Sequence, residues 1–292
     1  MYGSTPRSNQ GPLSERVGRS PPDSPVRAWS RRGFWYLSHA RTGGWTGQAS
    51  FGLLVLGPMD FVMAHGLDEA LAARDAAPGS ELLAGGTDLM VEVNLAHHRP
   101  SSVISLRHVP ELRVLEPRRI GSGVTWATLE RSELRALAQA ARTVGSPQIR
   151  AAGTLGGNIG TASPAGDGLP WLAALDADIE VASKSRGTRL VPWGDFFTGV
   201  KQTSLADDEI VTAAVLPADL PAHQEFAKIG PRHAMVISVV SAVVMRWDDG
   251  TTRVALGSVA PTPLRAQQAE GMISAEANPS DAALAEFARM VA

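Results

Sequence analysis

Hydrophobic and polar positions follow two different periods along the chain, and each period predicts one kind of element. Leu134, Leu137, Ala141 and Val144 recur every three or four residues, which places them on one apolar face of a predicted helix. Runs of alternating or β-branched residues predict strands at residues 81–84, 102–106, 120–124, 178–182 and 210–216. Helices and strands mix without strict alternation, so we expect an α+β architecture rather than a doubly wound sheet.

Two further helices are expected near the start of this pattern. Asp68 and Glu69 stand before the helix-forming residues 70–74, and Pro78-Gly79 ends the helix. The strand at 81–84 runs into a glycine-rich turn, and a second helical stretch follows that turn to about Leu95.

The last quarter of the chain has its own pattern. A proline-flanked polar segment at 217–221 predicts a linker. Residues 236–245 and 253–259 then predict a strand pair around the turn Asp248-Asp249-Gly250. Ser280 is an N-cap candidate for a final amphipathic helix.

The first residues lack both periods. Residues 1–50 are rich in serine, glycine, proline and arginine and cannot bury enough apolar surface to fold. We therefore expect a disordered leader at 1–55, a main domain at 56–220 and a small α+β domain at 224–292. Arg31-Arg32 is similar to a twin-arginine export signal, but no apolar stretch follows it. We therefore expect a cytoplasmic protein.

Composition excludes several classes of function. The chain of 292 residues has no cysteine, so it offers no disulfide, thiolate zinc site, catalytic thiol or cysteine ligand for an iron–sulfur cluster. Its longest apolar runs, at 51–56 and 236–244, are shorter than the roughly 18 residues of a membrane helix. The histidines lack the spacing of a metal site. Residues 1–50 hold seven arginines, although the whole chain has a net charge of −2, so the remaining residues carry a net negative charge. A nucleic-acid-binding surface would be basic instead.

Two glycine-rich turns are the best candidates for chemistry: Leu83–Asp88, and Thr154–Asn158 with Ser163–Asp167 just after it. Paired glycines permit positive φ and leave N–H groups uncovered, so successive amides can converge on an anion such as a pyrophosphate. The candidate side-chain donors and acceptors beside them are Thr87, Thr154, Asn158 and Asp167. Glycine pairs also make plain tight turns, and neither turn is a GxGxxG or Walker loop, so the pattern alone leaves both interpretations open.

Taken in order, the motifs resemble the FAD-binding medium subunit of molybdenum hydroxylases, the group of xanthine dehydrogenase and aerobic carbon monoxide dehydrogenase. Leu82–Leu89 is similar to the first flavin loop of that family, and Thr154–Ile159 with Ala162–Asp167 is similar to the second. Further matches follow in order at 198–201 with 205–211, 226–228 and 257–265. The resemblance runs from about Met59 to the end of the chain, and 147–150 and 235–237 look most like xanthine dehydrogenase subunits.

This resemblance implies a two-part FAD-binding domain of the vanillyl-alcohol-oxidase and p-cresol-methylhydroxylase type at 56–220. Both loops would wrap the pyrophosphate, Asp167 would bind the ribityl or phosphate end, and Val211 and Lys228 would lie against the isoalloxazine ring. The full set of implied FAD-binding residues is Leu82, Leu83, Ala84, Gly85, Gly86, Thr87, Asp88, Leu89, Thr154, Leu155, Gly156, Gly157, Asn158, Asp167, Val211 and Lys228. The family's usual segment beyond the last helix is missing, so we expect a shortened C-terminal domain.

The implied role is that of an electron-transfer subunit with noncovalent FAD. A molybdenum-binding large subunit and an iron–sulfur small subunit would carry the molybdenum cofactor and the [2Fe–2S] clusters. Because this chain has no cysteine, the clusters must come from another polypeptide. FAD would pass electrons to NAD+ or another acceptor. The alternatives are a scaffold subunit that holds no flavin and a stand-alone flavin oxidase.

Overall fold

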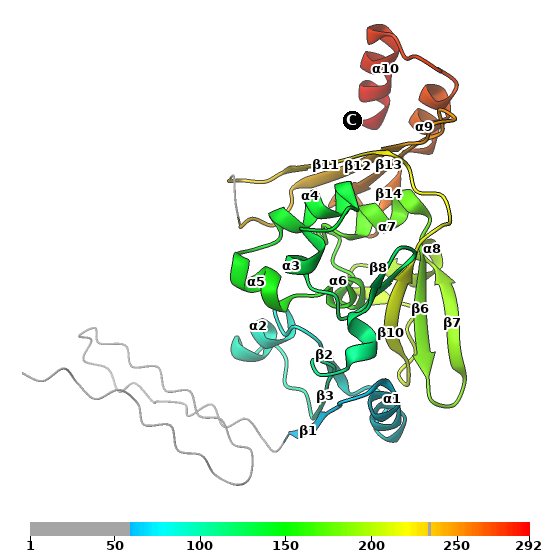
Figure 1. The fold of residues 1–292 in the computed structure, drawn as a ribbon. Coiled ribbons are helices and arrows are strands. Elements are labelled where there is room, and N and C mark those ends of the chain that lie inside the picture. The colour runs from blue at the N-terminus through cyan, green and yellow to red at the C-terminus, as the bar shows by residue number, and fades with distance from the viewer. Residues whose placement is uncertain (1–58, 233–234) are drawn as a thin grey trace, which may run out of the picture. The chain divides into compact units, whose positions relative to one another are not determined.

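The computed structural model describes residues 59–232 and 235–292, so the predicted leader lies outside the described residues. The described chain begins with a small parallel sheet (Figure 1). Its strands are β1 (Asp60–Met63), β3 (Ser102–Ser105) and β2 (Glu81–Leu83), in that order across the sheet. Helix α1 (Leu67–Ala76) joins β1 to β2, and its buried residues share a small core with β3. Helix α2 (Leu89–Asn94) follows β2.

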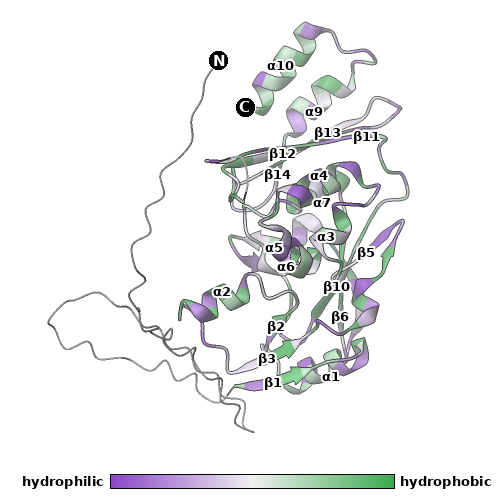
Figure 2. Cartoon of the chain, turned by 60° about the vertical axis from the view of Figure 1, so that its left-hand side comes forward, coloured by the Kyte–Doolittle hydropathy of each residue, from purple (hydrophilic) through white to green (hydrophobic). Residues whose placement is uncertain are grey.

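A second sheet of five antiparallel strands lies beside this unit. Its order is β4 (Leu115–Glu116), β5 (Arg119–Gly121), β10 (Ile210–Val215), β6 (Asp178–Ser183) and β7 (Gly187–Pro192). The central strands β6 and β10 are mostly buried and hydrophobic (Figure 2). The 3₁₀ turn η1 (Pro110–Arg113) precedes β4.

Helices fill the chain between β5 and β6 and form the main core against this sheet. They are α3 (Trp126–Leu129), α4 (Arg135–Thr143), α5 (Pro147–Ala152), α6 (Leu155–Thr161) and α7 (Leu169–Leu175). Every residue of α7 is buried, because the helix lies between the core of the second sheet and the third sheet. A short helix, α8 (Trp193–Phe196), and the pair β8 (Phe197–Gly199) and β9 (Gln202–Thr203) connect β7 to β10.

The third sheet covers α4 and α7 on their other side (Figure 1). Its antiparallel order is β11 (His223–Ile229), β12 (Val240–Arg246), β13 (Thr252–Gly257) and β14 (Leu264–Arg265). Helices α9 (Gln267–Ser274) and α10 (Asp281–Val291) complete the described chain.

Most of the predicted elements are confirmed, including the mixed α+β architecture and the N-cap at Ser280, whose side chain accepts from the Ala283 N–H group. The strand predicted at 236–245 begins only at Val240. The residues before it are hydrophobic but not part of the sheet, and Ile237 is 78% exposed. Strand β5 ends at Gly121, because Gly121 and Gly123 pack against the Leu112 carbonyl and turn the chain.

Strand β11 was not predicted. Its residues include His223, Glu225 and Lys228, and hydrophilic side chains mask the alternation that its burial pattern follows. Within 59–232 and 235–292, no helix has the length and hydrophobicity needed to cross a membrane.

Candidate functional site

A cleft of about 1080 Å³ lies between the β2–α2 segment and helix α6, and it reaches β10 and β11. All of the implied FAD-binding residues line this cleft except Leu155. Leu155 is the first residue of α6, and its side chain is fully buried in the hydrophobic core. The fold therefore gathers segments that are more than 140 residues apart in the sequence, from Leu82 to Lys228, around one cavity.

The first glycine turn presents free backbone donors to this cleft. None of the N–H groups of Ala84–Asp88 donates a hydrogen bond to another residue of the described chain. Gly85 packs so closely on the end of α5 that a Cβ atom there would lie 2.0 Å from the Ala152 carbonyl oxygen. Gly86 has φ +72°, a conformation that favours glycine. The turn is thus shaped to hold several uncovered amides in a row, which suits an anion.

In the second glycine turn most of the amides already have partners. The Leu155 N–H group donates to the Val124 carbonyl at 3.0 Å, and the Gly156 N–H group donates to the Ser122 carbonyl at 2.8 Å. The Gly157 N–H group donates to Thr154 Oγ1 at 2.9 Å, because Thr154 is the N-cap of α6. The N–H groups of Leu155–Asn158 are therefore not free for a pyrophosphate, contrary to expectation, whereas the Thr154 N–H group donates to no residue of the described chain.

Glycine serves a different purpose on α6. A Cβ atom at Gly156 would lie 2.3 Å from the Cβ atom of Ser122, so this glycine allows the helix to pack against the chain after β5. A Cβ atom at Gly160 would meet nothing within 4 Å, and at Gly157 it would meet only Thr154 Oγ1. Both of these glycines line the cleft. They leave α6 without side chains there, so a ligand can approach its backbone closely.

A buried ion pair closes one end of the cleft. Lys228 Nζ on β11 donates to Asp167 Oδ2 at 2.5 Å, and both side chains are more than nine-tenths buried. Thr143 Oγ1 donates to the same oxygen at 3.2 Å. The other carboxylate oxygen, Asp167 Oδ1, is buried and has no hydrogen-bond partner in the described chain. Burial raises the pKa of Asp167, although Lys228 and Thr143 act in the opposite direction.

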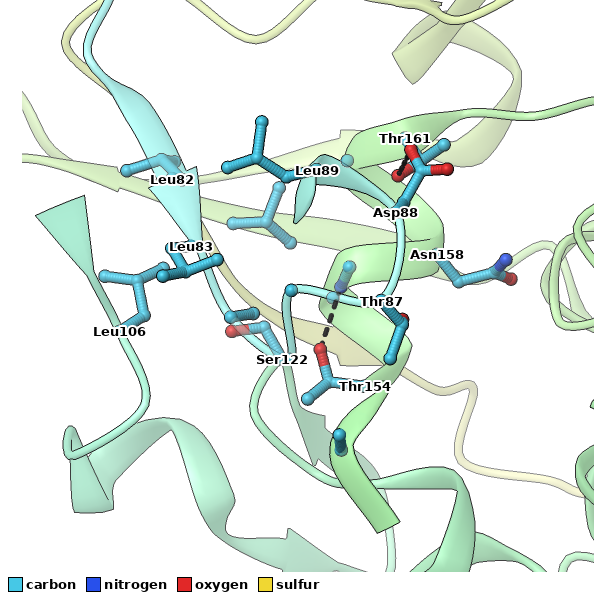
Figure 3. Close-up of a pocket in the computed structure, with 18 of the residues that line it drawn as sticks. Leu82, Leu83, Thr87, Asp88, Leu89, Leu106, Ser122, Thr154, Asn158 and Thr161 are labelled. Carbon is cyan, nitrogen blue, oxygen red and sulfur yellow. Dashed lines mark hydrogen bonds between the residues drawn. The ribbon is translucent and has the colours of Figure 1, made fainter. Parts of the chain in front are cut away.

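Apolar and polar residues occupy different parts of the cleft. Figure 3 shows Leu82, Leu83 and Leu106 gathered on one side, while Asp88 and Asn158 lie on the other. Asn158 Oδ1 accepts from the Gly168 N–H group at 3.2 Å, so its amide links α6 to the start of α7. Val211 lies at a β-bulge in β10 and also lines the cleft. The cleft therefore fits a ligand with an apolar part and an anionic part.

Several residues of the site were not predicted to act there, among them Ser122, Thr143, Glu92 and Thr161. Their contacts are made only in the tertiary structure, and no local spacing marks them. Lys201 stands within one of the matched motifs, Thr198–Lys201, but no role was assigned to it.

Comparisons with known proteins agree with this geometry. A family model described as "FAD binding domain in molybdopterin dehydrogenase" matches residues 57–219. The nicotinate dehydrogenase FAD-subunit of Eubacterium barkeri is 36% identical over 218 residues, which are 68% of this chain and 73% of that protein. The xanthine dehydrogenase FAD-binding subunit of Escherichia coli O157:H7 is 36% identical over 209 residues, 66% of this chain and 71% of that protein.

The fold also matches solved structures. A chain of carbon monoxide dehydrogenase from Hydrogenophaga pseudoflava superimposes with a TM-score of 0.72 at 29% sequence identity. The match covers 80% of this chain and 85% of that one.

Proposed function

Because the chain belongs to the FAD-binding medium subunits of molybdenum hydroxylases, a family of oxidoreductase flavoproteins, we propose that its cleft binds one FAD through the residues gathered there. The observation that carries this proposal is the row of free N–H groups at Ala84–Asp88, which opens into a cleft of about 1080 Å³. These amides would hold the pyrophosphate. Gly157 and Gly160 would let the cofactor lie close against α6.

The residues of the cleft fit FAD in a second respect. Asp167 Oδ1 is a buried acceptor without a partner among the described residues, and a buried acceptor needs a donor. FAD offers such donors in its ribityl and ribose hydroxyl groups and in the ring N–H, whereas an ionised phosphate would be repelled by the carboxylate. We therefore assign Asp167 to a hydroxyl or ring N–H group of FAD rather than to its phosphates.

Lys228 and Val211 would face the isoalloxazine ring. The ammonium group of Lys228 would stabilise negative charge on the ring. The ion pair with Asp167 fixes the position of this ammonium group. When bound, FAD supplies the redox chemistry, and the chain sets its position and potential. We also assign the parallel sheet and the five-stranded sheet to the two parts of a vanillyl-alcohol-oxidase-type FAD domain, and β11–α10 to a separate C-terminal domain.

In this proposal electrons arrive from [2Fe–2S] clusters on an iron–sulfur partner subunit, since the chain has no cysteine to ligate one. The substrate would be oxidised at a molybdenum cofactor on a large subunit, and NAD+ or another acceptor would receive the electrons. The support is the family membership and the similarity to a chain of a carbon monoxide dehydrogenase.

Purification of the full chain, followed by its visible absorbance spectrum, tests the FAD proposal. We expect an oxidised-flavin spectrum, or uptake of one FAD per apoprotein chain on titration. Acid precipitation should release intact FAD into the supernatant, because the site has no cysteine and no histidine in either turn to form a covalent bond. A well-folded apoprotein that takes up no flavin would instead indicate a scaffold subunit.

A further inference from the structure

The segment that carries the free amides is held in two different ways. At Gly85 the backbone packs on the end of α5 so closely that a side chain has no room there. Beyond it, helix α2 buries only one side chain, that of Val93, while Met90 and Val91 are 41% and 51% exposed. Hydrophobic burial therefore stabilises the position of α2 very little. Other contacts must hold α2 and residues 86–88 at the cleft.

Two polar contacts fulfil this role. Thr161 Oγ1 donates to Asp88 Oδ2 at 3.2 Å, a contact drawn as a dashed line in Figure 3. Lys201 Nζ donates to Glu92 Oε1 at 2.7 Å. All four residues line the cleft. Asp88 and Glu92 belong to the α2 segment, which forms one wall of the cleft. Thr161 and Lys201 belong to the opposite wall, at the end of α6.

The opposite side is a firm anchor. Thr161 is the last residue of α6, and the Lys201 N–H group donates to the carbonyl of Ala162, the next residue along the chain, at 3.0 Å. The turn that carries Lys201 is thus tied to the same end of α6 as Thr161. Both contacts therefore join the weakly packed α2 to one fixed point across the cleft.

We propose that these two contacts, Asp88–Thr161 and Glu92–Lys201, form a clasp that retains FAD by holding the amide-bearing segment closed over it. The inference rests on the proposed FAD site and adds Glu92, Thr161 and Lys201 to the residues that govern binding. For FAD to leave, α2 must swing away from α6, and this motion breaks both contacts. Opening the clasp therefore speeds release, while the chemistry of the bound ring is unaffected.

The charges of the clasp are suited to this task. The hydrogen bond and charge of Lys201 lower the pKa of Glu92, and Glu92 in turn raises the pKa of Lys201, so both groups are ionised throughout the neutral range. Both side chains are more than a third exposed, at 37% and 51%. Their attraction is therefore modest and is screened by salt.

The release rate of FAD from the full-length holoprotein tests the clasp. Lys201→Met and Glu92→Gln should each speed FAD release about twofold to fivefold, the range expected for a partly exposed ion pair, with little change in the association rate. The charge-exchanged double variant, Lys201→Glu with Glu92→Lys, should restore slow release. At high salt the differences between the single variants and the wild type should disappear.

Lys184→Met is the matched control. Lys184 Nζ lies 3.9 Å from Asp75 Oδ2 in another partly exposed lysine–carboxylate pair that is not in the cleft. Its loss should leave the release rate unchanged. Wild-type release rates in both clasp variants would overturn the clasp while the FAD site stands. Failure of the wild-type protein itself to bind FAD would overturn the proposed function and the clasp together.

Discussion

The two turns share a Gly-Gly pair, in Ala-Gly-Gly-Thr and Leu-Gly-Gly-Asn, and the fold uses the pair differently in each. The first glycine of each pair, Gly85 or Gly156, serves close packing, since a Cβ atom would collide with a neighbouring segment in both cases. The second glycines differ. Gly86 has φ +72° within a row of free amides, whereas the N–H group of Gly157 is bonded to its own helix cap.

The difference shows that a Gly-Gly pair does not by itself make an anion site. What matters is whether the N–H groups around it already have partners. In the second turn the neighbouring carbonyls of Ser122 and Val124 take up these donors, because α6 packs against the chain after β5. In the first turn no described neighbour does so, and the donors remain for a ligand.

Substitution of the first glycine of each pair removes the close packing that the two turns share, and it should cost the most stability. Gly85→Ala and Gly156→Ala place a Cβ atom 2.0 Å and 2.3 Å from neighbouring atoms, so the surrounding backbone must shift. We expect each apoprotein to lose about 3 kcal/mol of unfolding free energy, at the upper end for overpacked sites. Urea denaturation of the apoproteins measures this loss. Wild-type stability in either variant would mean that the close packing is not needed.

Gly86→Val tests the feature that distinguishes the first turn, which is a glycine with positive φ within a row of free amides. The positive φ should cost the apoprotein about 1–3 kcal/mol, and a displaced amide should weaken FAD binding about tenfold to a hundredfold. Gly187→Val is the matched control, because Gly187 has φ +71° at the β6–β7 turn, away from the cleft. Denaturation and FAD titration of both variants separate the effects. Equal FAD affinity in the two would contradict the role of the free amides.

Thr154→Ala tests the second turn. Loss of the N-cap should lower the unfolding free energy by about 1 kcal/mol, because the Gly157 N–H group loses its acceptor. FAD affinity should fall less than in Gly86→Val, since the N–H groups of Leu155 and Gly156 have acceptors elsewhere in the chain. Ser280→Ala removes the cap of α10 in the same way and should leave FAD binding intact. A loss of affinity as large as that of Gly86→Val would show that Thr154 binds the cofactor directly.

The smallest effect comes from Gly160→Ala, which is expected to act in opposite directions on folding and on binding. Alanine in place of glycine within a helix should raise apoprotein stability by up to about 1 kcal/mol. The added methyl group enters the cleft, so FAD should bind more weakly. Gly271→Ala in α9 also meets open space and should stabilise the fold without this penalty. Unchanged FAD affinity in Gly160→Ala would mean that the cofactor does not lie against α6.

Neighbouring residues were enough to predict many of the local elements and the candidate segments of the site. The periodicity around Leu137, the caps and the glycine turns are properties of neighbouring residues, so α4, α10 and the turn after β2 could be predicted. The resemblance then indicated FAD as the cofactor and implied that Asp167 and Lys228 bind it. Strand β11 was missed because its polar residues mask its alternation.

Which of these groups have free hydrogen-bonding atoms depends on how distant segments pack against one another. A hydrogen-bond donor is available only if no distant segment accepts from it, and this depends on packing between residues such as Gly156 and Ser122. For the same reason the sequence did not reveal that Lys228 pairs with Asp167, or that Lys201 reaches Glu92 across the cleft. Each of these contacts joins segments at least 61 residues apart, and no local pattern encodes where two such segments meet.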